Sequence, residues 1–160
     1  MENKPGKVSV VVTCYKYAHY LAGALDSILS QTYSDLEVVV VNDGTPNHAD
    51  EVMNPCAGEP RVKYIKQKNG GQANAKNVGV KNSRGEFIAF LDADDRWKKD
   101  KLEKQIPLFE DARVGVVYSR IFLVQENRDP VEFFPNLPHL SPRSVEVTRH
   151  VIFDNFIPFS

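Results

Sequence analysis

The fold is decided by a short stretch near the start of the chain, Val8-Ser9-Val10-Val11-Val12-Thr13-Cys14. Its residues are mostly β-branched, and its hydrophobicity is nearly continuous rather than alternating. Two later stretches repeat the pattern, Leu36-Glu37-Val38-Val39-Val40-Val41 and Phe87-Ile88-Ala89-Phe90-Leu91. Short apolar runs of this kind are typical of strands that are buried on both faces, as in a parallel sheet.

Segments with helical spacing separate these strands. One helical face is formed by Leu21, Leu25, Ile28 and Leu29. A second helix is predicted over residues 74–82, and a third contains Leu102, Ile106 and Phe109, where Pro107 should kink or end it.

Weaker strands at residues 62–65 and 114–124 complete a regular alternation of strand and helix. This order predicts an α/β/α sandwich with a mostly parallel central sheet and right-handed crossovers.

The pattern weakens beyond residue 124. Prolines divide residues 125–144 into turns, and a short helix is expected over residues 145–154. The last residues, 156–160, are mostly apolar, although domains usually end in polar, exposed segments. We therefore expect a core at residues 1–124, a loop and the start of a further region at residues 125–160, and a fold that is truncated at its C-terminus.

The composition excludes several classes of protein. Lys and Arg number 20 against 21 Asp and Glu, so the net charge is −1 and no basic excess supports general nucleic-acid binding. No stretch approaches the roughly 20 apolar residues that a membrane span needs. The two cysteines cannot form a disulfide framework, which favours a soluble protein of the reducing cytoplasm.

Polar residues follow the predicted strands at their carboxyl ends. In an open parallel sheet, ligands bind beyond these ends, near the point where the strand order reverses. The residues at the carboxyl ends of the three strongest strands are Thr13-Cys14-Tyr15, Asn42-Asp43-Gly44-Thr45 and Asp92-Ala93-Asp94-Asp95. One rim of the sheet therefore collects hydroxyl groups, an aromatic ring and carboxylates.

The most specific feature of this rim is the cluster of Asp92, Asp94 and Asp95. Three carboxylates in one turn repel one another unless a cation or solvent screens them. Mg²⁺ and Mn²⁺ bind carboxylate oxygens and keep positions open for diphosphate oxygens. The alternative is an acidic turn that caps the next helix, a role that Asp95 alone could fill. The position at the end of a strand favours a metal for the cluster as a whole.

The other candidate residues carry less specific signals. Asp43 could accept hydrogen bonds from a ribose or a base, or it could belong to an ordinary Asp-Gly turn. Tyr15 could stack on a base, and Lys76 could neutralise a diphosphate or be simply solvated. The backbone amides of Gly70-Gly71 open a helix and would attract phosphate. Trp97 either lines the pocket or packs in the core.

In their order along the chain, these motifs resemble those of the family 2 glycosyltransferases, which have the GT-A fold. The matching stretches are Val10-Val11-Val12-Thr13-Cys14-Tyr15, Ser27-Ile28-Leu29-Ser30-Gln31-Thr32-Tyr33, Glu37-Val38-Val39-Val40-Val41-Asn42-Asp43-Gly44-Thr45, Asn69-Gly70-Gly71, Ala75-Lys76-Asn77-Val78-Gly79, and Gly85-Glu86-Phe87-Ile88-Ala89-Phe90-Leu91-Asp92-Ala93-Asp94-Asp95. The resemblance runs from about Val8 to Gln105.

The resemblance implies a nucleotide-diphospho-sugar donor, usually a UDP-sugar, bound with Mn²⁺ or Mg²⁺. Residues 1–124 would then be the nucleotide-sugar-binding GT-A core, and residues 125–160 would begin the acceptor side. By the same resemblance, Thr13, Tyr15 and Asp43 contact the uridine, with Asp43 at the uracil.

For the rest of the donor, the resemblance implies that Asp92 contacts the ribose and that Asp94 holds the metal. With Asp95 from the acidic cluster, the candidate metal ligands are Asp94 and Asp95. Lys76 stands where the family often has arginine, and a lysine keeps the charge but loses the planar fork for bidentate contact.

The implied reaction transfers a sugar to an acceptor hydroxyl with inversion, while a carboxylate base takes the proton of that hydroxyl. The family has this base in a later motif, which we expect beyond residue 160. Glu126, Asp129 and Asp154 match no family motif, so no catalytic residue is assigned. A glycan or lipid-linked acceptor and polysaccharide biosynthesis at the inner membrane face are implied, with membrane contact undecided.

Other interpretations stay open from the sequence. An apolar strand edge near the C-terminus would permit a homodimer. A nucleotidyltransferase-like enzyme uses similar carboxylate and metal chemistry, although the segment after the first strand here, residues 13–20, contains no glycine. A catalytically inert module that only binds nucleotide-sugars is the alternative outside the enzymes.

Overall fold

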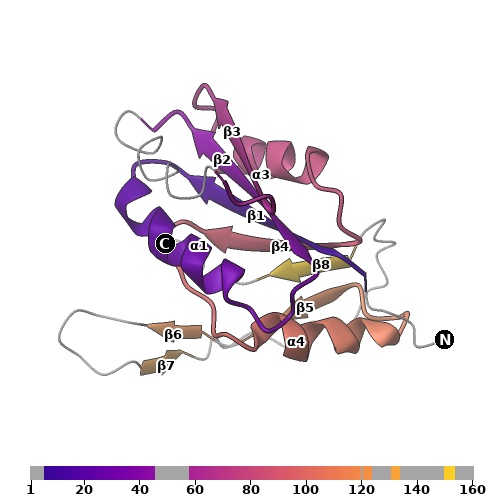
Figure 1. The fold of residues 1–160 in the computed structure, drawn as a ribbon. Helices are drawn as coiled ribbons and strands as arrows, with labels where there is room; N and C mark the ends of the chain where they lie inside the picture. The colour runs from indigo at the N-terminus through magenta and orange to yellow at the C-terminus, as the bar shows by residue number, and fades with distance from the viewer. Residues whose placement is uncertain (1–5, 46–57, 120, 124–130, 134–149, 154–160) are drawn as a thin grey trace.

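A six-stranded sheet forms the centre of the computed structural model, which describes residues 6–45, 58–119, 121–123, 131–133 and 150–153. The strand order is β3-β2-β1-β4-β8-β5, and all neighbouring pairs are parallel (Figure 1). The strands are β1 (Val8–Cys14), β2 (Leu36–Asp43), β3 (Val62–Gln67), β4 (Phe87–Asp92), β5 (Val116–Tyr118) and β8 (His150–Phe153). The predicted α/β class with a mostly parallel sheet is confirmed.

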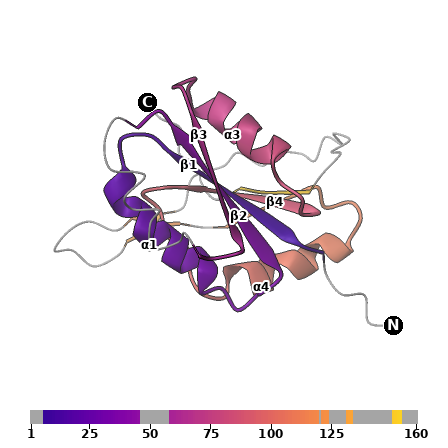
Figure 2. The same cartoon turned by 45° about the horizontal axis from the view of Figure 1, so that its top comes forward.

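Helices cover both faces of the sheet, which gives three layers (Figure 2). Helices α1 (Ala18–Leu29) and α4 (Lys101–Gln105) lie on one face, and α3 (Gln72–Lys81) lies on the other. After Gln105 the chain continues as a 3₁₀ helix, η2 (Ile106–Glu110), which contains Pro107. Proline lacks the N–H that an α-helix needs, so the predicted end of the helix at this position is confirmed.

Neighbouring residues of β2 are buried in different cores, one on each face of the sheet. Val38 and Val40 of β2 belong to the larger core with α1 and α4, whereas Val39 and Val41 belong to a smaller core with Ala75 of α3. This two-sided burial is the reason that the strands read as continuous apolar runs.

Close contact between α3 and β1 depends on Gly79. A Cβ atom at this position would lie 2.2 Å from Cγ1 of Val11, so a larger residue would push the helix away from the strand. Glycine therefore sets the distance between this helix and the sheet.

Two predicted elements near the C-terminus are wrong. The strand expected over residues 114–124 is divided into β5 and β6 (Ile121–Leu123), because β6 pairs antiparallel with β7 (Val131–Phe133) in a separate sheet. Part of the helix expected over residues 145–154 is strand β8, which pairs with both β4 and β5. Partners that lie far away in the sequence decide both outcomes. The regular alternation of strand and helix also implies a helix between β2 and β3, where residues 46–57 lie outside the described residues.

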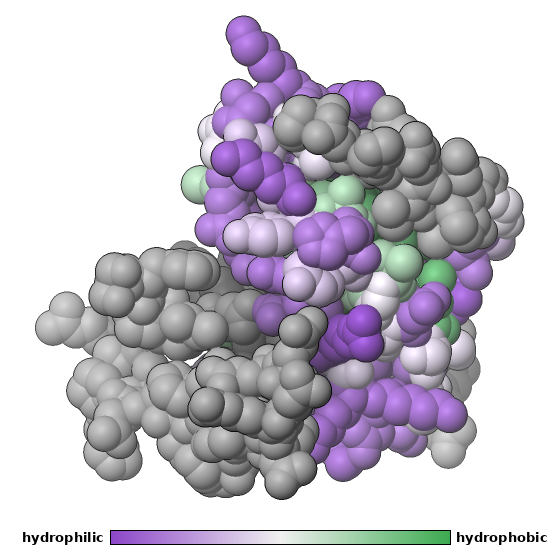
Figure 3. Space-filling view, turned by 90° about the vertical axis from the view of Figure 1, so that its left-hand side faces the viewer, coloured by the Kyte–Doolittle hydropathy of each residue, from purple (hydrophilic) through white to green (hydrophobic). Residues whose placement is uncertain are grey.

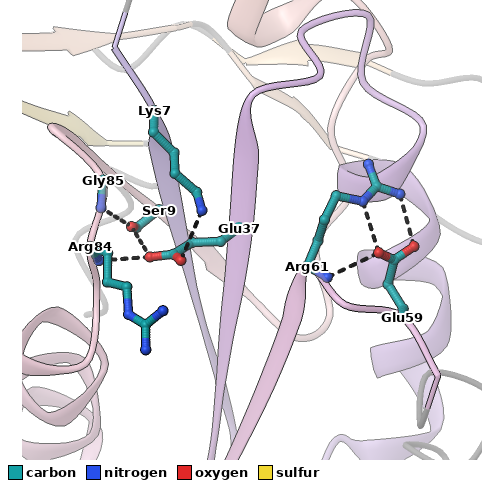
Figure 4. Close-up of polar contacts among 7 residues, drawn as sticks. All are labelled: Lys7, Ser9, Glu37, Glu59, Arg61, Arg84 and Gly85. Carbon is teal, nitrogen blue, oxygen red and sulfur yellow. Dashed lines mark hydrogen bonds and ion pairs between the residues drawn. The ribbon is translucent and has the colours of Figure 1, made fainter.

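The amino ends of the strands are held together by Glu37 (Figure 4). One of its oxygens accepts hydrogen bonds from Ser9 Oγ at 2.7 Å and from the Arg84 amide at 2.6 Å, while the other lies 3.2 Å from Lys7 Nζ. Burial alone would raise the pKa of Glu37, but these hydrogen bonds and the lysine outweigh it and lower that pKa. This network ties β1, β2 and the segment before β4 together.

Candidate functional site

The site lies where the strand order reverses. Strand β1 pairs with β2 on one side and with β4 on the other, so Thr13 is opposite both Val41 and Asp92. The chain runs from β1 outward to β2 and β3, then returns to the other side of β1 with β4. Figure 3 views the molecule from the side to which these strands point in Figure 1, and the described residues there are mainly hydrophilic. Such a switch point is where open parallel sheets bind ligands.

Asp92, the last residue of β4, is held by three side chains. Thr13 Oγ1 donates to its Oδ1 at 3.3 Å, and Gln72 Nε2 lies 3.4 and 3.3 Å from its two oxygens. Lys76 Nζ forms an ion pair with it at 3.3 Å. The lysine and the glutamine both come from α3, so this helix fixes the carboxylate at the switch point and balances its charge.

Asp43, the last residue of β2, is 3% exposed and accepts three hydrogen bonds. Its Oδ1 receives Gln67 Nε2 at 2.7 Å and the Gly70 amide at 2.9 Å, and its Oδ2 receives the Gly71 amide at 3.0 Å. The two glycine amides that the sequence assigns to phosphate thus bind a carboxylate of the protein, and that interpretation is wrong. Asp43 fixes the loop that opens α3.

Gly44 allows this loop to approach β2. Its φ is +75°, and a Cβ atom here would lie 2.8 Å from the backbone nitrogen of Asn69. Only glycine combines this backbone conformation with so close a contact. The Asp-Gly pair therefore forms the turn that the sequence offered as one alternative, while contact of Asp43 with a ribose or a base stays a prediction.

The first residues after β1 are exposed at the same rim. Tyr15 is 41% exposed, and Lys16 Nζ lies 5.1 Å from the centre of its ring. Lys16 has φ +67°, a conformation that residues other than glycine seldom adopt and that is enriched at functional sites. The aromatic ring of Tyr15 is accessible to a planar ligand.

Asp94 lies in the turn after β4 and is exposed. Burial raises the pKa of the Cys14 thiol, the hydrogen bond with Thr45 lowers it, and the charge of Asp94 adds to the increase. Asp94 follows two residues after Asp92, which pairs with Thr13 near the end of β1, and Cys14 at the end of β1 adjoins β2 at Asn42. The carboxylates after β2 and β4 thus lie at the same edge of the sheet, as the sequence predicts.

Comparison with known proteins decides the family. The profile of "Glycosyl transferase family 2" matches residues 9–153. The chain belongs to this glycosyltransferase family. An uncharacterised glycosyltransferase of Nostoc sp. is 37% identical to this family 2 chain over 128 residues, which are 79% of this chain and 40% of the relative.

Solved glycosyltransferases have the same fold as this family 2 chain. The mannosyltransferase PcManGT of Pyrobaculum calidifontis, in complex with GDP-Man and Mn²⁺, has a TM-score of 0.68 and 26% identity over 74% of this chain and 37% of its own. S. aureus TarS in complex with UDP-GlcNAc has a TM-score of 0.65 and 26% identity over 77% of this chain and 36% of its own. These neighbours establish the GT-A fold, and this chain spans well under half the length of either.

A divalent cation fits the family 2 site only if a ligand supplies part of its coordination. In the part of the chain that the structure describes, no three His, Cys, Asp or Glu side chains are grouped to hold an ion. Asp94 makes no hydrogen bond or ion pair to any described residue. Mg²⁺ typically binds one or two carboxylates and completes its shell with substrate phosphates and water. The residues present fit that mode.

Sequence reasoning missed three glutamines of the site region. Gln67 ends β3 and binds Asp43, and Gln72 begins α3 and binds Asp92. Gln31 lies within a family motif, yet it binds Lys98 and Leu102, which follow it by 67 and 71 positions in the sequence. The place of Gln67 at a strand end and of Gln72 at a helix start could have indicated their roles. No local signal in the sequence indicates the role of Gln31.

Trp97 is 7% exposed and packs in the larger core, so the alternative that it lines the site is wrong for most of its surface.

None of the helices in the described residues is both long enough and apolar enough to cross a membrane.

Proposed function

We propose that this chain forms the donor-binding part of an inverting glycosyltransferase. The donor is a nucleotide-diphospho-sugar, with a UDP-sugar as the expected case, and the acceptor is a hydroxyl of a glycan or lipid-linked glycan. Mn²⁺ or Mg²⁺ assists the transfer. The catalytic base stays a prediction for a later motif, and none of the described residues is assigned that role.

One observation carries this proposal: the unequal state of two carboxylates in the same turn. Asp92 is fixed by Thr13 and Gln72, and its charge is balanced by Lys76. Asp94, two residues later, is exposed and has no such partner in the described part of the chain. The first carboxylate is suited to accept hydrogen bonds from a ribose, and the second is suited to hold a cation.

The other rim residues support a nucleoside at the end of β1. Tyr15 offers an exposed ring on which a base could stack, at about 1–3 kcal/mol for such a contact. Asp43 has few free acceptor positions, because both of its oxygens already accept hydrogen bonds from the protein. We propose that it meets the uracil with the position that is left on Oδ2 and that it mainly holds the loop of Gly70 and Gly71 in place.

Lys76 and Asp94 would share the work of stabilising the leaving group. Breaking the anomeric C–O bond leaves negative charge on a diphosphate oxygen. A bound divalent cation would act there as a Lewis acid. Lys76 of α3 forms an ion pair with Asp92, so its positive charge would be available to a diphosphate that binds beside this carboxylate.

The relatives support a nucleotide-sugar donor but differ in its base. TarS was solved with UDP and with UDP-GlcNAc, and PcManGT was solved with GDP-Man and Mn²⁺. A set of UDP, GDP, dTDP and CDP, each with Mn²⁺, separates these cases by thermal shift. We expect UDP to raise the melting temperature most. A larger increase with GDP would show that the donor carries guanosine and not uridine.

The metal assignment is tested by calorimetry with UDP, with Mn²⁺ or with EDTA, on the wild type and on Asp94→Ala. We expect Mn²⁺ to tighten UDP binding to the wild type about tenfold or more, which is roughly 1.4 kcal/mol. Asp94→Ala should keep the binding seen in EDTA and lose the gain. Asp26→Ala, which removes an exposed carboxylate of α1, is the matched control. An equal gain in Asp94→Ala and wild type would refute the role of Asp94.

A further inference from the structure

We propose that the end of α1 and the residues directly after it form a clamp that positions the Asp92–Asp95 turn, and that Gln31 is its central positioning residue. The clamp consists of Ser27, Gln31 and Thr32, and it holds residues 97–103. This inference rests on the proposed function, because its consequence is the placement of Asp94 for a cation.

Gln31 binds the segment through both ends of its amide. Its Nε2 donates to the Lys98 carbonyl at 2.8 Å and to the Ser27 carbonyl at 3.0 Å. Its Oε1 accepts the Leu102 amide at 3.1 Å. The side chain is only 7% exposed, so water cannot replace these partners, and an unmade hydrogen bond there is costly.

Ser27 and Thr32 extend the contact on either side of Gln31. Ser27 Oγ accepts the Trp97 amide at 3.1 Å while it donates to the Ala24 carbonyl at 2.7 Å. The Thr32 amide donates to the Lys99 carbonyl at 3.0 Å, and its hydroxyl donates to Glu103 at 2.6 Å.

The same face of α1 also meets the residue directly after the acidic turn. A Cβ atom on Gly23 would lie 2.5 Å from Arg96 Nη2, so the arginine lies against the helix at this point. Gly23 and Ser27 are four residues apart and therefore share one side of α1, and Gln31 follows in the segment directly after the helix. In that order they meet Arg96, Trp97 and Lys98. Helix α1 and the segment directly after it thus contact consecutive residues of the chain where it leaves the turn.

The turn itself is short enough for this clamp to fix it. Its first residue, Asp92, is held by β4 and by α3, and the Asp95 amide donates to the Asp92 carbonyl at 3.0 Å. Only Arg96 separates Asp95 from Trp97. Asp94 has no bond of its own to a described residue, so its position depends on these two anchored ends. A displacement of about 1 Å at a site of this kind has large effects on its chemistry.

The test uses Gln31→Leu and Ser27→Ala, with Ser83→Ala as the matched control. Ser83 is buried at the far end of α3, where its hydroxyl binds the Gly79 carbonyl at 2.9 Å. Trp97 is the single tryptophan of the chain, so its emission and its quenching by acrylamide report on the clamped segment. In both clamp variants we expect red-shifted emission and stronger quenching, with the circular dichroism of the wild type retained. Ser83→Ala should leave the emission unchanged.

Calorimetry then connects the clamp with the site. Gln31→Leu should keep UDP binding in EDTA and lose most of the roughly tenfold gain that Mn²⁺ gives to the wild type. An unchanged gain, or unchanged Trp97 emission, would overturn the inference. So would an equal loss of binding with and without Mn²⁺, because that result indicates a general structural role. If Gln31→Leu does not fold, Ser27→Ala answers the same question.

Failure of the proposed function would appear differently. The wild type would then show no gain in UDP binding from Mn²⁺, while Trp97 of the clamp variants would still become more accessible to acrylamide.

Discussion

At the scale of single residues, Asp43 shows how one carboxylate can serve the fold and the site together. Gln67, Gly70 and Gly71 all donate to it, and they come from β3 and from the loop that opens α3. Lys76 and Gln72, which fix Asp92, follow directly on the same helix. The position of Asp43 therefore determines where α3 begins and how its side chains reach the neighbouring strand.

We expect Asp43→Asn to weaken both the fold and nucleotide binding. The new amide would place N–H groups opposite backbone N–H groups, so the free energy of unfolding should fall by about 2 kcal/mol. The Kd for UDP should rise about tenfold. Urea denaturation and calorimetry measure the two effects. Asp26→Asn on exposed α1 should change neither, and a wild-type urea midpoint for Asp43→Asn would show that these hydrogen bonds are unimportant.

At the scale of elements, the site depends on how closely α3 packs on the sheet. Gly79 faces Val11 of β1, where the space for a Cβ atom is absent. Because Lys76 lies one helical turn before Gly79, any outward shift of the helix also moves the lysine away from Asp92.

Gly79→Ala should therefore lower both stability and donor affinity, although alanine favours helix formation. Overpacking of this kind costs about 1–3 kcal/mol. Urea denaturation measures the loss, and calorimetry with UDP measures the accompanying rise in Kd. Lys81→Ala, at an exposed position near the end of the same helix, should stay within about 0.5 kcal/mol of wild type. A more stable Gly79→Ala would mean that helix propensity outweighs the close contact with Val11.

At the scale of the whole molecule, the two ends of the sheet have different roles. The carboxyl ends carry the exposed acidic turn and the aromatic rim, whereas the amino ends carry the network of Lys7, Ser9, Glu37 and Arg84 (Figure 4). Strands β1, β2 and β4 connect the two ends. Loss of the network should therefore affect global unfolding and leave nucleotide binding intact.

Glu37→Gln tests this separation through pH. A carboxylate whose pKa is lower in the folded state contributes stability above its unfolded pKa, here 4.5, and loses it as the pH falls through the lower folded value. At pH 7 the variant should be about 1–3 kcal/mol less stable than wild type. Between pH 7 and pH 3 the difference should shrink, since wild type alone must protonate Glu37. Thermal unfolding across this range measures it, and the Kd for UDP should stay at the wild-type value.

Identical losses for wild type and Glu37→Gln on acidification would contradict this account. The ion pair of Glu59 with Arg61, in which the arginine lowers the pKa of Glu59 to about 2, is an internal reference, because it is intact in both proteins.

The sequence by itself determined strands β1 to β4, their parallel arrangement and the edge at which the chemistry lies. Burial on both faces leaves a continuous apolar run, and a parallel sheet brings the carboxyl ends of its strands to one side. Thr13, Asp43, Asp92 and Asp94 could therefore be placed at one rim from local patterns alone. Their roles toward a donor, and the division of the chain at residue 124, stay predictions.

Only the tertiary structure decided which of these groups are already occupied. The amides of Gly70 and Gly71 bind Asp43 from 27 and 28 residues away, and α3 balances the charge of Asp92. Gln31 binds Lys98 and Leu102, which follow it by 67 and 71 positions in the sequence. Strand β8 likewise finds its place through β4 and β5. The physical reason is that the hydrophobicity of consecutive residues indicates whether a strand is buried. The partner of a buried polar group follows from which distant segment packs against it.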